Sequence, residues 1–345
     1  MNKISWRSPS NIALIKYWGK TGNQLPMNPS LSFSLDAAFT ETTIAVIEGA
    51  DNNGVDVSLT FEGNKNKPFE DRLAKFINSA IKHIPSLKGL RLEIDSYNSF
   101  PHSSGIASSA SSMSALALGL VVIEQKLLGN ITQFNDFQQK TSFIARLGSG
   151  SAARSVYGGY SVWGAVPENN RFSDEYATDI NDLIHPIFKS YRDAILLVTH
   201  KEKKVSSSVG HQLMENHPFA ATKFKESFKN IELMLGIMQK GEQLDFALLI
   251  EREALSLHAM MMTSNPSFIL MEPQTIAIIG KIRDFRQETG LPVCFTLDAG
   301  ANVHFIYPEK DTVPVKLFIE NELLPHCYNR QWIDDKVGLG PVRLT

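Results

Sequence analysis

Cysteine, net charge and long apolar runs are all scarce in this chain, and each scarcity excludes a class of protein. Only two cysteines, Cys294 and Cys327, occur among 345 residues. Two thiols are too few for a disulfide framework or a cysteine-based metal cluster, and they fit a reducing cytoplasm. The formal net charge of -2 provides no basic field that would attract nucleic acid or an anionic membrane. We therefore expect a cytoplasmic protein that binds neither.

The longest apolar run, residues 113–123, is too short to cross a membrane, because a span needs about 20 residues. Ser114 and Gly119 interrupt the run and Glu124 ends it, so it is predicted to form a buried helix. The N-terminal segment contains no apolar stretch of the secretory type, which again favours a cytoplasmic protein. The nine histidines lack metal-ligand spacing, and His258 on an apolar helix is interpreted as a core histidine with its hydrogen bonds satisfied.

The length of 345 residues predicts two lobes, since single hydrophobic cores stop growing at about 250–300 residues. The first half alternates strand and helix patterns, and the second half is mostly amphipathic helix. We place the boundary near residue 190, which gives lobes of 1–190 and 191–345. Strands are predicted at 30–39, 43–48, 55–61, 90–95, 159–165 and 194–199, with a hairpin of 295–297 and 303–307. Helices are predicted at 69–80, 106–127, 131–147, 219–239, 246–262, 275–288 and 313–323.

Small residues and serines gather between a predicted strand and the long helix that follows it. Residues 101–112 read Pro-His-Ser-Ser-Gly-Ile-Ala-Ser-Ser-Ala-Ser-Ser. Small side chains let backbone N–H groups approach an anion, the helix N-terminus adds positive potential, and the hydroxyl of Ser109 can reach a terminal phosphate. A small-residue helix packed closely against a sheet is the alternative. The triplet Gly19-Lys20-Thr21 does not belong to a Walker loop, because Leu14 occupies the position of its first glycine.

The segment 101–110, Pro-x-x-x-Gly-Ile-Ala-Ser-Ser-Ala, resembles the phosphate-binding loop of the GHMP kinase superfamily. Other segments resemble signatures of one branch of that superfamily, the mevalonate diphosphate decarboxylases. Residues 8–20, Ser-Pro-Ser-Asn-Ile-Ala-Leu-Ile-Lys-Tyr-Trp-Gly-Lys, are similar to the N-terminal signature nearly residue for residue. The others are 148–159, 205–208, 296–302 and the C-terminal 337–341. Because these long motifs occur in the family's order, they are more specific than a single glycine loop.

The resemblance implies an α+β, two-lobed GHMP kinase fold with a ribosomal-S5-like N-terminal lobe, a ferredoxin-like C-terminal lobe and the site in the cleft. It also implies an ATP-dependent enzyme of isoprenoid biosynthesis in the mevalonate pathway. Such enzymes use ATP to phosphorylate the tertiary 3-hydroxyl of mevalonate 5-diphosphate. The new phosphate then leaves with carbon dioxide, which yields isopentenyl diphosphate. ATP carries the Mg²⁺ that phosphoryl transfer needs, and a homodimer is implied in the same way.

Three charged residues would carry the chemistry. The resemblance places Asp298 where a carboxylate accepts or positions the proton of the 3-hydroxyl, although alone it would indicate an ordinary Asp-Ala-Gly turn. Lys16 lies in an apolar segment where an unpaired ammonium is costly, so it needs an acidic partner, which the resemblance identifies as Asp298. Arg154 would hold the C1 carboxylate bidentately, with Ser149 and Ser151 beside it. Without the motif, Arg154 would suit a surface ion pair equally well.

The remaining site residues are assigned by resemblance to the phosphate tail or to ATP. The diphosphate tail would be contacted by Tyr17, Lys20, Ser207 and Ser208. ATP would be contacted by Asn98, Ser103, Ser104, Gly105, Ala107, Ser108 and Ser109. Taken alone, Lys16 and Lys20 could be solvated cations, and an asparagine ahead of a loop is usually a turn residue.

Three positions depart from the family's usual pattern. Ala153 stands where the second signature often has cysteine, and this removes no obvious catalytic group. Ser208 stands where relatives often have Arg or Thr, and His211 where they often have Met, at positions toward the phosphate tail. A decarboxylase of mevalonate 5-phosphate and a mevalonate 3-kinase therefore stay open, although Asp298, Lys16 and Arg154 together favour decarboxylation. A non-catalytic ligand sensor is a third alternative, which the presence of the aspartate and of the phosphate-loop serines disfavours.

Overall fold

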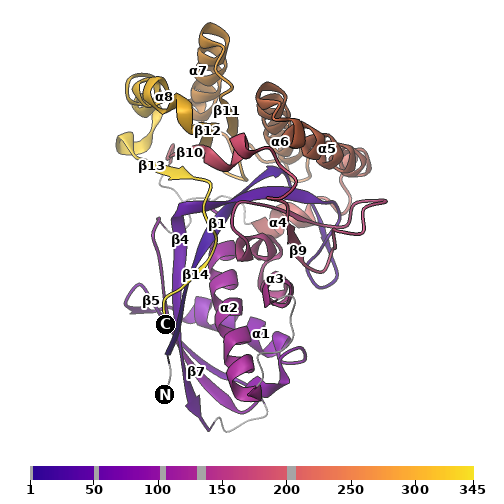
Figure 1. The fold of residues 1–345 in the computed structure, drawn as a ribbon, viewed down its shortest axis with the longest axis vertical. Coiled ribbons are helices and arrows are strands. Elements are labelled where there is room, and N and C mark those ends of the chain that lie inside the picture. Colours follow the sequence, from indigo (N-terminus) through magenta and orange to yellow (C-terminus); the bar gives the residue numbers. More distant parts are fainter. Residues whose placement is uncertain (1–2, 50–53, 102–105, 130–136, 200–206) are drawn as a thin grey trace.

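The computed structural model describes residues 3–49, 54–101, 106–129, 137–199 and 207–345. These residues form two lobes, drawn one above the other in Figure 1. The N-terminal lobe is built on an eight-stranded sheet of order β14-β1-β4-β7-β5-β6, in which β8 pairs with β4 and β9 with β8. Its strands are β1 (Lys3–Ile15), β4 (Ser30–Glu48), β5 (Asp56–Phe61), β6 (Asn64–Lys65), β7 (Leu90–Asn98), β8 (Tyr160–Trp163), β9 (Ala177–Asp179) and β14 (Val342–Arg343).

The two longest strands differ from the sequence prediction. β4 is one strand, and the predicted break between 39 and 43 is wrong because Thr40 pairs with Ser8 on one side and Asn98 on the other. No strand is predicted over residues 3–15, yet β1 forms there because β4 pairs with it along most of its length. A shift of register follows Pro9, as expected where a residue cannot donate a ladder hydrogen bond.

Three helices cover this sheet: α1 (Lys67–Ala80), α2 (Ser108–Leu128) and α3 (Phe137–Gly148). The Asn66 side chain accepts a hydrogen bond from the Phe69 N–H at 3.1 Å and so begins α1. Helix α2 is buried from Ala110 to Glu124, which confirms the prediction for the apolar run. Its length and composition would allow it to cross a membrane, but 78% of its most apolar window is buried inside the protein. Residues 131–136 of the predicted second helix lie outside the described residues.

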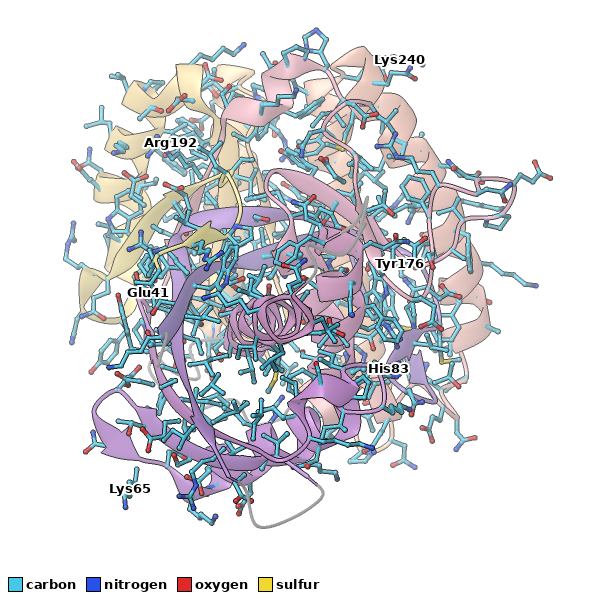
Figure 2. The ribbon with its side chains drawn as sticks, turned by 60° about the horizontal axis from the view of Figure 1, so that its bottom comes forward. Glu41, Lys65, His83, Tyr176, Arg192 and Lys240 are labelled. Carbon is cyan, nitrogen blue, oxygen red and sulfur yellow. The ribbon has the colours of Figure 1, made fainter. Side chains whose placement is uncertain are left out.

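The C-terminal lobe contains an antiparallel sheet of order β11-β12-β10-β13, in which the predicted hairpin is confirmed by pairing of Phe295 with Phe305. Its strands are β10 (Tyr191–Leu196), β11 (Cys294–Thr296), β12 (Val303–Pro308) and β13 (Trp332–Lys336). The main helices are α5 (Ala220–Lys240), α6 (Gln243–Met262), α7 (Pro273–Thr289) and α8 (Thr312–Phe318), preceded by the short α4 (Ser207–Gln212). Charged side chains such as Lys65 and Lys240 lie at the periphery of the molecule (Figure 2).

The two lobes share a hydrophobic core. Leu14 and Phe33 of the first sheet belong to the same buried cluster as Ile195 of the second sheet and Ile250 of α6. The chain also returns to the first sheet at its C-terminal end, where Arg343 pairs with Trp6, and both ends lie side by side in Figure 1. The division at residue 190 therefore stays a prediction.

Candidate active site

A cavity of about 240 Å³ lies where the end of β1, the start of α2, the turn after α3, α4, α6 and the loop after β11 meet. Nine residues predicted for the site line this cavity: Lys16, Tyr17, Lys20, Ala107, Ser109, Ser149, Ser151, Arg154 and Asp298. Two others, Asn98 and Ser108, do not line it. Ser103, Ser104 and Gly105 lie outside the described residues, as do the side chains of Ser207 and Ser208.

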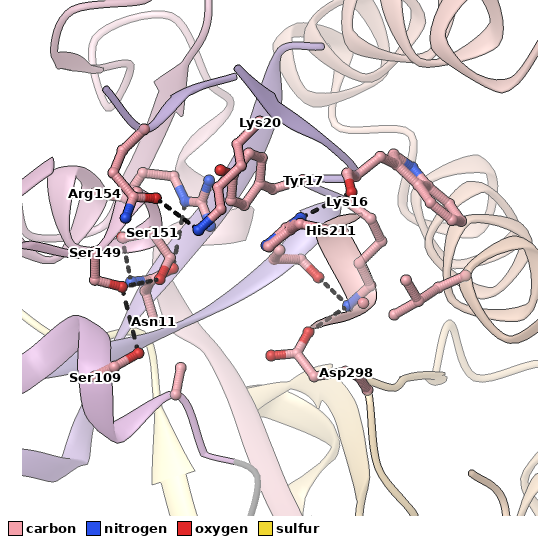
Figure 3. A pocket seen from close by; sticks show the side chains of 18 of the residues that line it. Asn11, Lys16, Tyr17, Lys20, Ser109, Ser149, Ser151, Arg154, His211 and Asp298 are labelled. Carbon is pink, nitrogen blue, oxygen red and sulfur yellow. Dashed lines mark hydrogen bonds and ion pairs between the residues drawn. The ribbon is translucent and has the colours of Figure 1, made fainter. Parts of the chain in front are cut away.

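The predicted ion pair between Lys16 and Asp298 is present. The Lys16 Nζ atom lies 3.0 Å from Asp298 Oδ1 and also donates a hydrogen bond of 2.6 Å to the Ala13 carbonyl (Figure 3). The Lys16 side chain is 2% exposed and that of Asp298 is 29% exposed, so the carboxylate faces the cavity while the ammonium lies behind it. Burial lowers the pKa of Lys16, and the negative charges of Asp298 and then of Glu253 oppose that shift. The pair is thus an open carboxylate held by a buried cation.

The segment that carries Lys16 and Tyr17 leaves β1 and is fixed through its backbone. Asn28 donates from Nδ2 to the Lys16 carbonyl at 2.8 Å and accepts from the Trp18 N–H at 3.1 Å. The Trp18 carbonyl accepts a hydrogen bond from Nδ1 of His211 at 2.8 Å. His211 also packs on the Tyr17 ring, with centroids 4.1 Å apart. Side chains therefore replace the ladder hydrogen bonds that this non-strand segment lacks.

Arg154 is buried at 2% exposure, and no acidic side chain forms an ion pair with it within the described residues. Its Nε donates to Asn11 Oδ1 at 3.3 Å and its Nη1 donates to the Ser30 hydroxyl. Burial lowers the pKa of Arg154 to about 10, which Asp298 and Tyr17 oppose. A buried guanidinium that lines a cavity with only neutral partners is a site for an anion, and a planar fork fits a carboxylate best.

The serines form a polar wall opposite the ion pair. Ser109 at the start of α2 lies with its hydroxyl 3.3 Å from that of Ser149, which lies 3.5 Å from that of Ser151 (Figure 3). Ala107, just before α2, has a φ of 43°, a left-handed conformation that an alanine adopts only under constraint. Hydroxyl groups at the start of a buried helix can donate hydrogen bonds to phosphate oxygens. They can also be ligands of the Mg²⁺ that accompanies the phosphates, because Mg²⁺ prefers oxygen ligands. Within the described residues no cluster of three acidic or histidine side chains could hold a metal alone.

Lys20 and Arg72 line the part of the cavity next to the phenol ring of Tyr17. Burial, followed by the nearby Arg72 charge, lowers the pKa of Lys20, whose Nζ contacts Gln24 at 3.1 Å. Arg72 projects from α1 and is exposed. Burial raises the pKa of Tyr17, and its hydroxyl has no hydrogen-bond partner among the described residues. These groups leave donors available to a phosphate tail.

Several cavity residues are not identified by sequence reasoning: Asn11, Gln24, Arg72, Gly210, Leu257 and Met261. Asn11 lies inside the 8–20 signature and Gly210 lies between Ser208 and His211, so these motifs could have identified both. The other four residues lie outside the motifs. Asn98 accepts a hydrogen bond from the Thr40 hydroxyl at 2.7 Å, and its Nδ2 has no partner in the described structure. A nucleotide contact by Asn98 stays a prediction.

The prediction that His258 is a core histidine is confirmed, but only one of its two ring nitrogens has a hydrogen-bond partner among the described residues. Its ring is 1% exposed, and Nε2 lies 3.2 Å from the Asp298 carbonyl, which can only accept, so Nε2 carries the proton. Nδ1 is buried and has no partner in the part of the chain that the structure describes. Burial, and then the charge of Lys16, lower the pKa of His258 to about 4, so the ring is neutral at pH 7. His258 lies against the predicted active site because α6 packs beside β1 and β11.

The fold and this set of residues together identify an enzyme with the GHMP kinase fold. Family models for the diphosphomevalonate decarboxylase-like N-terminal domain and the mevalonate 5-diphosphate decarboxylase C-terminal domain match residues 8–174 and 194–337. The chain is 32% identical to diphosphomevalonate decarboxylase of Aspergillus fumigatus, over 92% of this chain and 80% of that protein. The chain therefore belongs to the diphosphomevalonate decarboxylase family, which confirms the family expected from its motifs.

Solved structures agree with this assignment. Mevalonate diphosphate decarboxylase from Staphylococcus aureus superposes with a TM-score of 0.84 at 27% identity, covering 99% of this chain and 98% of that one. A decarboxylase complex with MVAPP, AMPPCP and magnesium superposes with a TM-score of 0.80 at 28% identity, with the same coverage. The predicted GHMP kinase fold is thus confirmed.

Phosphomevalonate decarboxylase of Haloferax volcanii is also similar in sequence, at 28% identity over 84% of each chain.

Proposed function

We propose that this protein catalyses the ATP-dependent decarboxylation of mevalonate 5-diphosphate to isopentenyl diphosphate. One observation carries the proposal: a single cavity presents the Lys16–Asp298 ion pair and, on another side, the buried Arg154 without an acidic partner among the described residues (Figure 3). The first arrangement suits a hydroxyl that becomes phosphorylated, and the second suits a carboxylate that becomes carbon dioxide. The relatives named above are enzymes of this chemistry.

The Asp298 carboxylate would accept or orient the proton of the substrate 3-hydroxyl as it attacks the terminal phosphate of ATP. Lys16 holds this carboxylate in place, because its ammonium lies 3.0 Å from Oδ1. Ser109 at the start of α2 would donate to the transferring phosphoryl group. Mg²⁺, bound to the ATP phosphates, would neutralise their charge, and the wall of serine hydroxyls could supply oxygen contacts to it.

Arg154 would hold the C1 carboxylate through its planar fork and so fix the orientation of the bond that breaks. The C3–O bond to the new phosphate breaks, and phosphate takes that electron pair. The electron pair of the C1–C2 bond then forms the C2–C3 double bond as carbon dioxide leaves. The hydroxyls of Ser149 and Ser151 lie in the same turn as Arg154 and would contact the same end of the substrate.

The phosphate tail would lie near Tyr17, Lys20 and Arg72, whose donors line the cavity. Ser207 and Ser208 stay predicted tail contacts. His211 lines the same region, and burial lowers its pKa to about 4, so it adds no positive charge at pH 7. A neutral group there, together with the similarity to a phosphomevalonate decarboxylase, makes mevalonate 5-phosphate the second candidate substrate. We also propose a cytoplasmic location, which the two cysteines and the N-terminal segment support, and a homodimer, which the family resemblance alone supports.

The test is ATP-dependent carbon dioxide release from mevalonate, its 5-phosphate and its 5-diphosphate. We expect the highest kcat/KM with the diphosphate. A higher value with the monophosphate would reassign the tail and leave the chemistry intact, while ADP without carbon dioxide would indicate a 3-kinase. Neither ADP nor carbon dioxide with any of the three would contradict an enzyme and favour a sensor. Light scattering of the purified protein tests the dimer.

A further inference from the structure

Helix α6 contacts the backbone at both halves of the Lys16–Asp298 pair. Lys16 comes from the end of β1 and Asp298 from the loop after β11, so they meet across 282 residues of sequence. Glu253 of α6 accepts a hydrogen bond from the Lys16 N–H at 3.1 Å. His258 of the same helix donates to the Asp298 carbonyl at 3.2 Å. Five residues of helix, about 7.5 Å along its axis, therefore separate the two anchoring side chains.

Three hydrogen-bond donors hold the buried carboxylate of Glu253 in place. Its Oε1 accepts from Lys223 Nζ at 2.7 Å and from Asn230 Nδ2 at 2.6 Å, both on α5, while Oε2 accepts from Lys16. The side chain is fully buried, at 0% exposure. A buried carboxylate is retained only where charges and hydrogen bonds compensate its desolvation. Both carboxylate oxygens accept hydrogen bonds, so both positions require an acceptor. A glutamine at this position would place its amide N–H group against one of these donors.

His258 is chemically matched to its own contact. The Asp298 carbonyl already accepts from the Gly300 N–H at 2.7 Å within the tight turn, and the imidazole supplies its second donor. The ring presents Nδ1 to a buried space without a partner in the described structure, which is a cost that packing alone does not explain. A donor fixed on the backbone of Asp298 accounts for a histidine at this buried position.

We infer that Glu253 and His258 are positioning residues, through which α6 sets the distance and orientation of Lys16 relative to Asp298. Neither side chain lines the cavity, so neither touches substrate in this arrangement. The ion pair joins segments from different lobes, and α6 contacts the backbone of both. A shift of about 1 Å at a reacting group can cost on the order of 100-fold in rate. This inference rests on the proposed decarboxylation, because the pair it positions is the one assigned to phosphoryl transfer.

The test compares Glu253→Gln with Glu251→Gln, a matched control on the same helix. Glu251 is also buried, at 2% exposure, and accepts from Arg283 and Arg286 of α7, away from Lys16 and Asp298. We expect both variants to lose similar thermal stability, whereas kcat falls about 10- to 100-fold only in Glu253→Gln. The KM values for ATP and the mevalonate substrate should change by less than about threefold, because Arg154 and the serine wall belong to other elements.

A second experiment uses variants of His258. His258→Leu removes the donor to the Asp298 carbonyl and should lower kcat about 10-fold, whereas His258→Gln, whose Nε2 can donate from a similar place, should recover most of it. Equal kcat in Glu253→Gln and Glu251→Gln would overturn the role of Glu253. Equal kcat in the leucine and glutamine variants would overturn that of His258. A wild-type protein without carbon dioxide release would instead contradict the proposed function itself, so the two failures are distinguishable.

Discussion

Replacing Arg154 by methionine should separate function from stability. The guanidinium is buried, and its pKa of about 10, against 12.5 for a free arginine, corresponds to roughly 3 kcal/mol of destabilisation of the charged form. The variant removes this cost but also loses the hydrogen bonds to Asn11 and Ser30, each worth about 1.5–3 kcal/mol when one partner is charged. The two hydrogen bonds together are worth about 3–6 kcal/mol, against the roughly 3 kcal/mol that is recovered, so we expect a melting temperature equal to that of the wild type or a few degrees lower.

The same substitution should impair turnover strongly. Removing one partner of a buried, hydrogen-bonded charge pair costs about 2–5 kcal/mol, which is roughly a 30- to 4,000-fold loss of kcat/KM. Both KM and kcat should worsen, because the fork binds the carboxylate and orients the bond that breaks. Arg154→Lys should recover little, since an ammonium lacks the planar fork. Steady-state carbon dioxide release, measured beside differential scanning calorimetry, gives both quantities.

Arg146→Met is the matched control. Arg146 is equally buried, at 2% exposure, but it pairs with Glu175 at 2.6 Å and does not line the cavity. Its loss leaves the carbonyls of Glu175 and Asn23 without their donor, which should cost at least about 2 kcal/mol of stability. We expect this variant to melt lower and to keep its kcat/KM. The reasoning would be refuted if Arg154→Met melted several degrees below Arg146→Met or turned over normally.

Two further predictions concern groups around the cavity. Ser109→Ala should lower kcat about 10²–10³-fold, the usual effect of losing one preorganised donor, with a smaller change in ATP affinity measured by titration calorimetry. His258 has a folded pKa of about 4, below its unfolded value of 6.5, so stability is lost as the pH falls through this window. In urea titrations from pH 7 to 4.5, the stability of His258→Gln should fall less steeply, by up to about 1.4 kcal/mol per pH unit. Unchanged kcat in the first, or parallel slopes in the second, would contradict these assignments.

The amino-acid sequence predicts the residues that line the site better than the buried residues that hold them in position. Lys16 requires an acidic partner wherever the fold buries it, so its pairing with Asp298 could be anticipated once the motif named the aspartate. Glu253 could not be anticipated, because a glutamate on an amphipathic helix ordinarily faces water, and only packing of α6 against β1 buries it. The same packing brings His258 to the Asp298 carbonyl, a contact between segments 40 residues apart.

The prediction of β4 from the sequence is limited in a similar way. Local alternation identifies most of β4, but the polar residues around Thr40 and Thr42 interrupt the pattern that predicts a strand. In the structure both threonines are buried, and their hydroxyls meet Ser111 and Ser96. Neighbouring elements therefore satisfy polar groups that the sequence prediction places between two separate strands. Boundaries fail where tertiary hydrogen bonds replace hydrophobic alternation.

The most direct test of the proposed chemistry is a single-turnover reaction of Asp298→Asn with ATP, Mg²⁺ and mevalonate 5-diphosphate, followed for both ADP and carbon dioxide. The two side chains are nearly isosteric, so the fold should persist, but the amide cannot take the hydroxyl proton and cannot neutralise Lys16, 3.0 Å away. Loss of general-base assistance alone is worth about 10²–10⁴ in rate, and the uncompensated Lys16 charge should deepen it. We predict that neither ADP nor carbon dioxide forms on the wild-type timescale. Rapid ADP formation without carbon dioxide would place Asp298 after phosphorylation, and near-normal carbon dioxide release would contradict the proposed active site.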